Sequence, residues 1–288
     1  MDRLATVRGF LLDMDGTVYL SDRLLPGTAA FLDYTRRAGI RVLFLTNNSS
    51  RHAAHYAEKI AAMGLEVTPE QILTSGEATA RYLQRRAPGS RVAVFGTPSL
   101  EEEFRQHGFT LDMKDPAYVV LGFDQTIDYA KLTLLCDLVR AGLPYIATHP
   151  DFNCPTATGF IPDIGAIIAF VEASTGRRPD AVIGKPNRPI IEMAADRLQL
   201  PVELLCMVGD RLYTDVAMGQ AAPIKTVLVL SGETKPPDLA ESPFQPDYVC
   251  ADLAHLTARL TAAPARPDPD GGAATADRPT QRDRSADR

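Results

Sequence analysis

The sequence of 288 residues contains no tryptophan, only four cysteines, and no run of basic residues. The cysteines are too widely spaced for a zinc site or a disulfide framework, and Cys136 and Cys206 lie in apolar patterns typical of buried thiols. A net charge of −6 argues against a nucleic-acid partner. No apolar stretch is long enough to cross a bilayer, and the first predicted strand begins too early to leave room for a signal peptide. We therefore expect no membrane association and a cytoplasmic location.

What the chain does contain is an ordinary globular composition, 45% hydrophobic and 23% charged, which is enough to build two domains. Short apolar runs alternate with helical patterns, and polar residues gather directly after each apolar run. This alternation predicts an α/β fold with a Rossmann-like parallel sheet, whose working edge lies at the carboxyl ends of the strands.

The strand–helix pattern is interrupted once. It covers residues 1–78, gives way to a block at 79–178 with its own strands and helices, and returns at 179–262 with a strand over Asp180–Ile183. The block predicts a separate small α/β domain inserted into the first. Residues 263–288 hold no aromatic or large aliphatic side chain and are expected to form a disordered tail.

Two aspartates stand out at the end of the first apolar run. Asp13 and Asp15 follow Gly9–Leu12, where they would face each other at the edge of the sheet. Their mutual repulsion indicates a cation, or an anionic substrate with its metal, in the space between them. Gly16 lets the chain turn sharply, and Thr17 offers a hydroxyl and a backbone donor.

Three further strand ends carry unusual polar residues, namely Thr46 with Asn47, Lys185, and Asp210 with Asp215. Each alone is explained by a helix cap, a turn or a solvated loop. Together on one sheet edge they predict phosphoryl transfer, because Mg²⁺ prefers carboxylate ligands and the remaining groups donate to phosphoryl oxygens. A carboxylate in such a site can also act as a covalent nucleophile, forming an aspartyl phosphate.

The order and spacing of these residues resemble the four motifs of the haloacid dehalogenase (HAD) superfamily. The segments that carry the resemblance are Asp13-Met14-Asp15-Gly16-Thr17, Thr46-Asn47, Lys185 and Gly209-Asp210-(four residues)-Asp215. Other segments resemble the NagD-like subfamily, type IIA: Thr46-Asn47-Asn48-Ser49, Val120-Leu121-Gly122-Phe123-Asp124, Tyr129-Ala130-Lys131-Leu132, Gly159-(two residues)-Pro162 and Val182-Ile183-Gly184-Lys185-Pro186. The resemblance covers about residues 6 to 260 and implies a HAD core with an inserted C2-type cap domain.

The resemblance also implies roles for the two aspartates and for the metal. Asp13 would be the nucleophile and a Mg²⁺ ligand. Asp15 would protonate the leaving group and then activate water, with its backbone carbonyl on the metal. Asp210 would be the third protein ligand.

The remaining motif residues would serve the phosphoryl group. Thr46, Asn47 and Lys185 would bind it, and Asp215 would support the metal through water or through Lys185. Gly16 and Thr17 would support the turn after the nucleophile.

The acid/base position narrows the predicted reaction. Dehalogenases and ATPase-type pumps lack the carboxylate that Asp15 supplies, whereas phosphoester hydrolysis and phosphomutase transfer need it. We expect a Mg²⁺-dependent phosphomonoester hydrolase that forms a phosphoaspartate on a small metabolite: a nucleotide, sugar phosphate, phosphoglycolate or aryl phosphate. The alternatives are a phosphotransferase of the same fold and a non-catalytic phosphate-binding member. Homodimers through the cap occur in this subfamily, and the sequence leaves that assembly open.

The chain departs from the subfamily pattern at two positions. His149 stands where asparagine is usual, and Asp163 stands where glycine is usual. Asp163 would either disfavour polyanionic substrates or cap the following helix, and we favour the cap. Both flank a polar loop predicted over Asp151–Asp163, in which Phe152 and Asn153 are the candidates for leaving-group recognition. The alternative for that loop is an ordinary polar connection.

Overall fold

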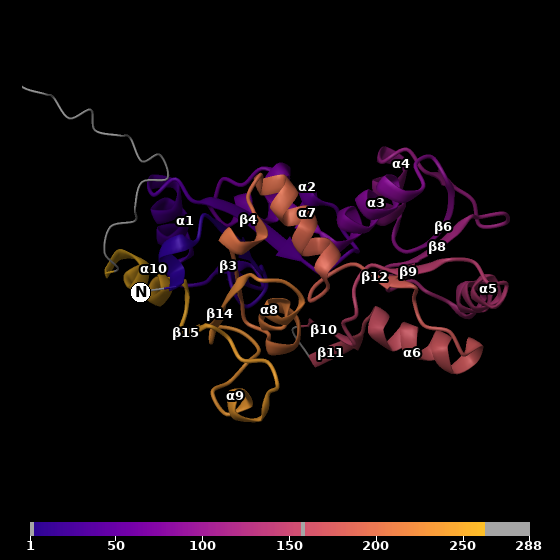
Figure 1. Cartoon of the computed structure of the whole chain (residues 1–288). Helices are drawn as coiled ribbons and strands as arrows, with labels where there is room; N and C mark the ends of the chain where they lie inside the picture. Colours follow the sequence, from indigo (N-terminus) through magenta and orange to yellow (C-terminus); the bar gives the residue numbers. More distant parts are fainter. Residues whose placement is uncertain (1–2, 157–158, 263–288) are drawn as a thin grey trace, which may run out of the picture.

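The computed structural model describes residues 3–156 and 159–262, so the predicted disordered tail at 263–288 lies outside the described residues. Within them the chain forms two parallel sheets, each with its own helices, arranged side by side along the molecule (Figure 1). The predicted fold class is confirmed: an α/β core with a second α/β unit inserted into it. In the described part of the chain, no helix is both long and apolar enough to span a membrane.

The first sheet has six parallel strands in the order β15-β14-β13-β1-β4-β5. Its strands are β1 (Gly9–Leu12), β4 (Arg41–Thr46), β5 (Ile72–Thr74), β13 (Leu205–Gly209), β14 (Lys225–Val229) and β15 (Tyr248–Cys250). Every residue of β1 is buried, since Phe10 and Leu12 pack into one apolar cluster and Leu11 into another on the opposite face. Such two-sided burial explains the uninterrupted apolar run in the sequence.

Helices connect these strands and cover the sheet. They are α1 (Thr28–Arg37), α2 (Ala53–Ala62), α7 (Arg188–Leu198), α8 (Met218–Ala221), α9 (Asp238–Glu241) and α10 (Leu253–Ala262). Three 3₁₀ turns (Arg3–Thr6, Pro69–Gln71 and Val202–Leu204) and a π-helical turn (Leu212–Val216) complete this unit.

The second sheet has five parallel strands in the order β12-β9-β8-β6-β7. Its strands are β6 (Arg91–Phe95), β7 (Thr110–Leu111), β8 (Tyr118–Leu121), β9 (Tyr145–Ala147) and β12 (Ala181–Val182), and its helices are α3 (Ser75–Arg86), α4 (Pro98–Gln106), α5 (Tyr129–Arg140) and α6 (Ile164–Thr175). One apolar cluster runs without interruption from Leu11 of the first sheet to Val120 of the second. The two sheets therefore share a buried layer.

The strand predicted over Asp180–Ile183 is assigned to the wrong sheet. It forms β12, which pairs in parallel with β9 of the second sheet through Ala181 and Val182. A two-residue, half-buried strand fits the edge of either sheet, so its composition does not determine which one it joins. The boundaries at residues 78 and 178 stay predictions.

The loop predicted over Asp151–Asp163 is also wrong, because it contains the antiparallel hairpin of β10 (Asn153–Thr156) and β11 (Gly159–Pro162). A second hairpin, β2 (Tyr19–Leu20) with β3 (Arg23–Leu24), follows the aspartate turn. Three of the four β11 residues are exposed, so no alternation of buried positions marks it as a strand in the sequence. The predicted buried thiols Cys136 and Cys206 are confirmed.

Candidate active site

Asp13 is the first residue beyond β1, and its backbone N–H continues the sheet by donating to Val208 O at 2.9 Å. The chain then turns through Gly16, whose φ of 84° lies in the left-handed region. A Cβ atom at Gly16 would overlap the Asp210 carboxylate, so glycine is required by both the turn and the contact. The turn thus brings the first predicted motif directly against the last.

Lys185 lies between two of the predicted acids. Its Nζ donates to Asp13 Oδ1 at 2.5 Å and to Asp215 Oδ1 at 2.7 Å, and the residue is only 2% exposed. Burial opposes its charge, but the two carboxylates outweigh burial and raise the pKa of Lys185 above its usual value. Lys185 is therefore a fixed cation beside the predicted nucleophile.

Asp13, Asp210 and Asp215 form an acidic group whose ligand atoms all lie within 4.8 Å of one another. Asp210 Oδ2 accepts a hydrogen bond from Glu233 N at 2.6 Å, whereas its buried Oδ1 has no partner within residues 3–156 and 159–262. Burial, with the charges of Asp13 and Asp215, raises the pKa of Asp210 well above its usual value. A divalent cation would relieve both the repulsion and the unpaired oxygen, so these residues fit a hard metal ion.

Asp215 is held differently from Asp210. One of its oxygens accepts from Lys185, and the other accepts from the backbone N–H of Arg211 at 3.1 Å. Both carboxylate oxygens are thus engaged by the protein. Asp215 fits a supporting position, and Asp210 the ligand position.

A second group of three potential ligands consists of His149, Asp151 and Asp163. Its members are already paired: His149 Nε2 lies 3.0 Å from Asp163 Oδ1, and Asp151 Oδ1 accepts from Asn47 Nδ2 at 2.9 Å. This group is satisfied by internal hydrogen bonds and gives no reason to place a metal there.

Asn47 links the two domains through its side-chain amide. Nδ2 donates to Asp151 Oδ1 and to the backbone carbonyl of Lys185, both at 2.9 Å, while Oδ1 accepts from Lys185 N at 2.8 Å. Thr46 Oγ1 accepts from Asn48 N at 3.2 Å, which leaves its hydroxyl proton to donate elsewhere. The structure therefore shows Asn47 positioning Lys185, and its predicted contact with phosphate stays a prediction.

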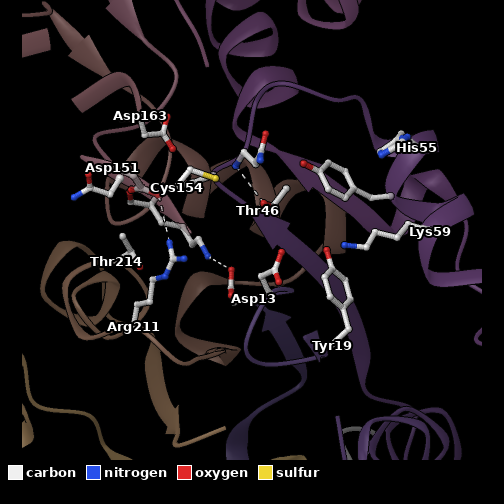
Figure 2. A pocket seen from close by; sticks show the side chains of 16 residues that line it. Asp13, Tyr19, Thr46, His55, Lys59, Asp151, Cys154, Asp163, Arg211 and Thr214 are labelled. Carbon is white, nitrogen blue, oxygen red and sulfur yellow. Dashed lines mark hydrogen bonds and ion pairs between the residues drawn. The ribbon is translucent and has the colours of Figure 1, made fainter. Parts of the chain in front are cut away.

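Six of these residues line one cavity of about 230 Å³ between the domains, namely Asp13, Thr46, Asn47, Asp151, Asp163 and Lys185. Figure 2 shows Asp13 and Thr46 in the middle, with Tyr19, His55 and Lys59 on one side. On the other side lie Asp151, Cys154, Asp163, Arg211 and Thr214. Of the two residues predicted to recognise the leaving group, Asn153 lines the cavity; Phe152 is 63% exposed and is not among the lining residues. Thr17 lies close by, and its buried hydroxyl has no partner within the described residues.

Several lining residues were missed in the sequence. Arg211 pairs with Glu233 at 3.0 Å and approaches Asp151 at 3.7 Å, and its position directly after Asp210 was an available signal. Lys59 lies 4.2 Å above the Tyr19 ring, but a lysine on an amphipathic helix gives no such signal.

Asp15 lies at the mouth of the cavity and keeps contact with solvent. Partial burial raises the pKa of its carboxyl; Lys59 opposes the rise and Asp13 adds to it. A carboxyl with a raised pKa holds its proton to higher pH, which suits a group that must donate a proton to a substrate.

Comparison with known proteins agrees with this geometry. The model of the haloacid dehalogenase-like hydrolase family matches residues 10–110, and a second HAD-hydrolase-like model matches residues 182–256. The acid sugar phosphatase of Staphylococcus haemolyticus is 36% identical over 247 residues, covering 85% of this chain and 94% of that protein. The chain belongs to the haloacid dehalogenase-like hydrolase family.

Two solved structures of the family are similar throughout. The 4-nitrophenylphosphatase of Thermotoga maritima is 45% identical with a TM-score of 0.88, covering 90% of this chain and 99% of that one. NagD from E. coli K-12 is 32% identical with a TM-score of 0.80, covering 86% and 97%. The predicted NagD-like, type IIA membership is confirmed, and the protein is a HAD phosphatase, a phosphomonoester hydrolase.

The raised pKa of the buried Asp210 carboxyl leads to a prediction about stability. An acid whose folded pKa lies above its unfolded value loses stability as the pH rises from the unfolded pKa through the folded one, because the folded state then holds a costly buried charge. In EDTA at pH 7, Asp210→Asn is expected to raise the free energy of unfolding by about 1–2 kcal/mol. Urea denaturation with EDTA and with Mg²⁺ measures this.

Mg²⁺ should then stabilise the wild type and leave Asp210→Asn almost unchanged, since the variant lacks a ligand. Equal stabilisation of both proteins by Mg²⁺ would remove Asp210 from the proposed metal site. Asp137→Asn, whose side chain is 62% exposed on α5, serves as the matched control and should follow the wild type.

Proposed function

We propose that this phosphatase uses Mg²⁺ and a phosphoaspartyl intermediate on Asp13 to hydrolyse small phosphorylated metabolites. The observation that carries the proposal is the convergence of Asp13, which the Lys185 ammonium holds, with Asp210, whose ligand atom lies within 4.8 Å of that of Asp13; one oxygen of Asp210 has no hydrogen-bond partner in the described chain. A nucleophilic carboxylate, a fixed cation and a vacant ligand oxygen are what phosphoryl transfer requires.

The side chains of Asp13 and Asp210 and the backbone carbonyl of Asp15 would hold the metal. Once bound, Mg²⁺ supplies positive charge that neutralises the phosphoryl oxygens and the clustered carboxylates. Asp215 would keep Lys185 in place through its 2.7 Å ion pair.

In the first step, a carboxylate oxygen of Asp13 attacks phosphorus and the ester P–O bond breaks. Asp15 gives its proton to the departing alkoxide, in keeping with its raised pKa. Lys185 and the Thr46 hydroxyl donate hydrogen bonds to the phosphoryl oxygens.

In the second step, Asp15 is a carboxylate and removes a proton from water as the water attacks phosphorus. The Asp13–phosphorus bond breaks, which releases inorganic phosphate and restores the Asp13 carboxylate. Asp15 ends the cycle protonated, so protons balance over the two steps.

The cavity of about 230 Å³ suits a phosphoryl group with a small leaving group. A nucleotide, sugar phosphate, phosphoglycolate or aryl phosphate all fall within the proposed substrates. The names of the relatives make sugar phosphates and 4-nitrophenyl phosphate the first probes. The cap-mediated homodimer and the cytoplasmic location stay predictions.

Phosphate release from p-nitrophenyl phosphate by the full chain, with Mg²⁺ and with EDTA, tests the proposal. A hydrolase releases one phosphate per p-nitrophenol even when an alcohol acceptor is added. The phosphotransferase alternative predicts less phosphate than p-nitrophenol with that acceptor. A non-catalytic member would release neither product.

A further inference from the structure

The two positions that depart from the NagD-like pattern, His149 and Asp163, form a buried pair. His149 Nε2 lies 3.0 Å from Asp163 Oδ1, and the imidazole is fully buried. On its other side, Nδ1 lies 3.1 Å from Thr148 Oγ1 and 3.4 Å from Ser75 Oγ. These contacts fix the imidazole and, through it, the Asp163 carboxylate.

Asp163 also caps α6, as the sequence suggested. Its Oδ1 accepts a hydrogen bond from Ile164 N at 2.7 Å, so the carboxylate sits at the positive end of a 12-residue helix. With glycine at this position, the helix end would present free N–H groups, which attract anions. Here the protein places its own anion there.

Asp163 lines the candidate substrate cavity. It is 5% exposed and lines the same cavity as Asp13 and Lys185, on the side that Figure 2 shows with Asp151 and Cys154. Asp151 accepts a hydrogen bond from Asn47, and the Arg211 guanidinium at 3.7 Å offsets its charge. Asp163 is therefore the carboxylate of this wall that has no arginine or lysine partner within residues 3–156 and 159–262.

The opposite wall does not reverse this charge. Its cation, Lys59, lies over the Tyr19 ring and acts on Asp15, whose charge it offsets. Lys185 is engaged by Asp13 and Asp215 at the phosphoryl end. Asp163 can accept hydrogen bonds from the hydroxyl groups of a leaving group that reaches the wall of the inserted domain. It repels a leaving group that carries a negative charge.

We propose that Asp163, held by His149, makes this phosphatase select neutral polyhydroxyl leaving groups and reject leaving groups that carry a carboxylate or a second phosphate. This rests on the proposed function and narrows its substrate class. We take the Asp163 carboxylate and an anionic leaving group to lie about 6 Å apart at an effective dielectric constant of about 40. Their repulsion then lowers kcat/KM about tenfold. The discrimination is thus large enough to measure.

Glycerol 3-phosphate and 3-phosphoglycerate make a matched pair of probes, since a hydroxymethyl group in one replaces a carboxylate in the other. The wild type should favour glycerol 3-phosphate in kcat/KM, and Asp163→Asn should reduce that preference about tenfold. Asparagine keeps the volume and the helix cap. The control is Asp128→Asn, which removes the exposed cap carboxylate of α5, outside the cavity lining, and should keep the wild-type preference.

An unchanged preference in Asp163→Asn, or an equal change in Asp128→Asn, overturns the inference. The inference is also overturned if the wild type hydrolyses p-nitrophenyl phosphate but cleaves neither glycerol 3-phosphate nor 3-phosphoglycerate. A wild-type preference for 3-phosphoglycerate overturns it as well. Absence of Mg²⁺-dependent release from all three esters instead overturns the proposed function, and the inference with it. If Asp163→Asn does not fold by circular dichroism, Asp163→Ser, which keeps a capping hydroxyl, carries the same comparison.

Discussion

Asp13→Asn is expected to lower Mg²⁺-dependent phosphate release from p-nitrophenyl phosphate by about 10⁴-fold or more. An amide oxygen is too weak a nucleophile to displace the leaving group, and the substitution also weakens a metal ligand. The variant should still fold, because Lys185 keeps its ion pair with the buried Asp215. Circular dichroism checks the fold, and steady-state phosphate release measures the loss.

A suitable control for this variant is Asp33→Asn, which removes a half-exposed carboxylate from α1, outside the cavity lining. It should retain wild-type activity. If Asp13→Asn releases phosphate at a rate close to that of the wild type, the covalent mechanism is excluded. Full-length protein mass also reports on it, since the wild type but not the variant should gain a phosphoryl group during turnover.

Asp15→Asn is expected to have the second largest effect, a loss of about 10²–10⁴-fold in steady-state turnover. The two steps should respond differently, because p-nitrophenolate leaves without needing a proton while water still needs a base. With p-nitrophenyl phosphate we expect a burst of about one p-nitrophenol per active site, followed by slow release of phosphate. Rapid-mixing absorbance at the p-nitrophenol band measures the burst.

An alkyl ester separates the two roles further. Glycerol 3-phosphate has a poor leaving group that needs the proton of Asp15, so the variant should show neither burst nor turnover with it. A variant that hydrolyses both esters at wild-type rates would exclude Asp15 as the acid/base group. If Asp15→Asn loses turnover equally on both esters and shows no burst with p-nitrophenyl phosphate, the role of Asp15 is limited to the first step.

The site gathers charges that do not favour folding by themselves. Asp13, Asp210 and Asp215 converge within 4.8 Å, and the charges of Lys185 and Arg211 offset them only in part. Buried like charges cost stability unless a cation or proton compensates them. The proposed metal and nucleophile would give this arrangement a use in binding and chemistry that compensates for its cost in stability.

The sequence by itself determined the parallel α/β class and most of the site. Asp13 and Asp210 could be placed together because each directly follows a short apolar strand, and the carboxyl ends of the neighbouring parallel strands β1 and β13 meet at one edge. Lys185 reaches the same place from β12, which belongs to the second sheet, so the sheet edge alone does not account for its position. The turn at Gly16 was equally readable, since it depends on local backbone freedom. Local patterns and chain direction suffice for such statements.

Only the tertiary structure decided which partners these residues take. Contacts between segments distant in the chain, or the direction of side chains, determine three features. These are the sheet that β12 joins, the β10–β11 hairpin and the pairing of His149 with Asp163. The same is true of Asn47, whose amide is engaged by Asp151 and Lys185. Composition sets which residues can make such contacts, but packing of the two domains around one cavity selects the pairs that form.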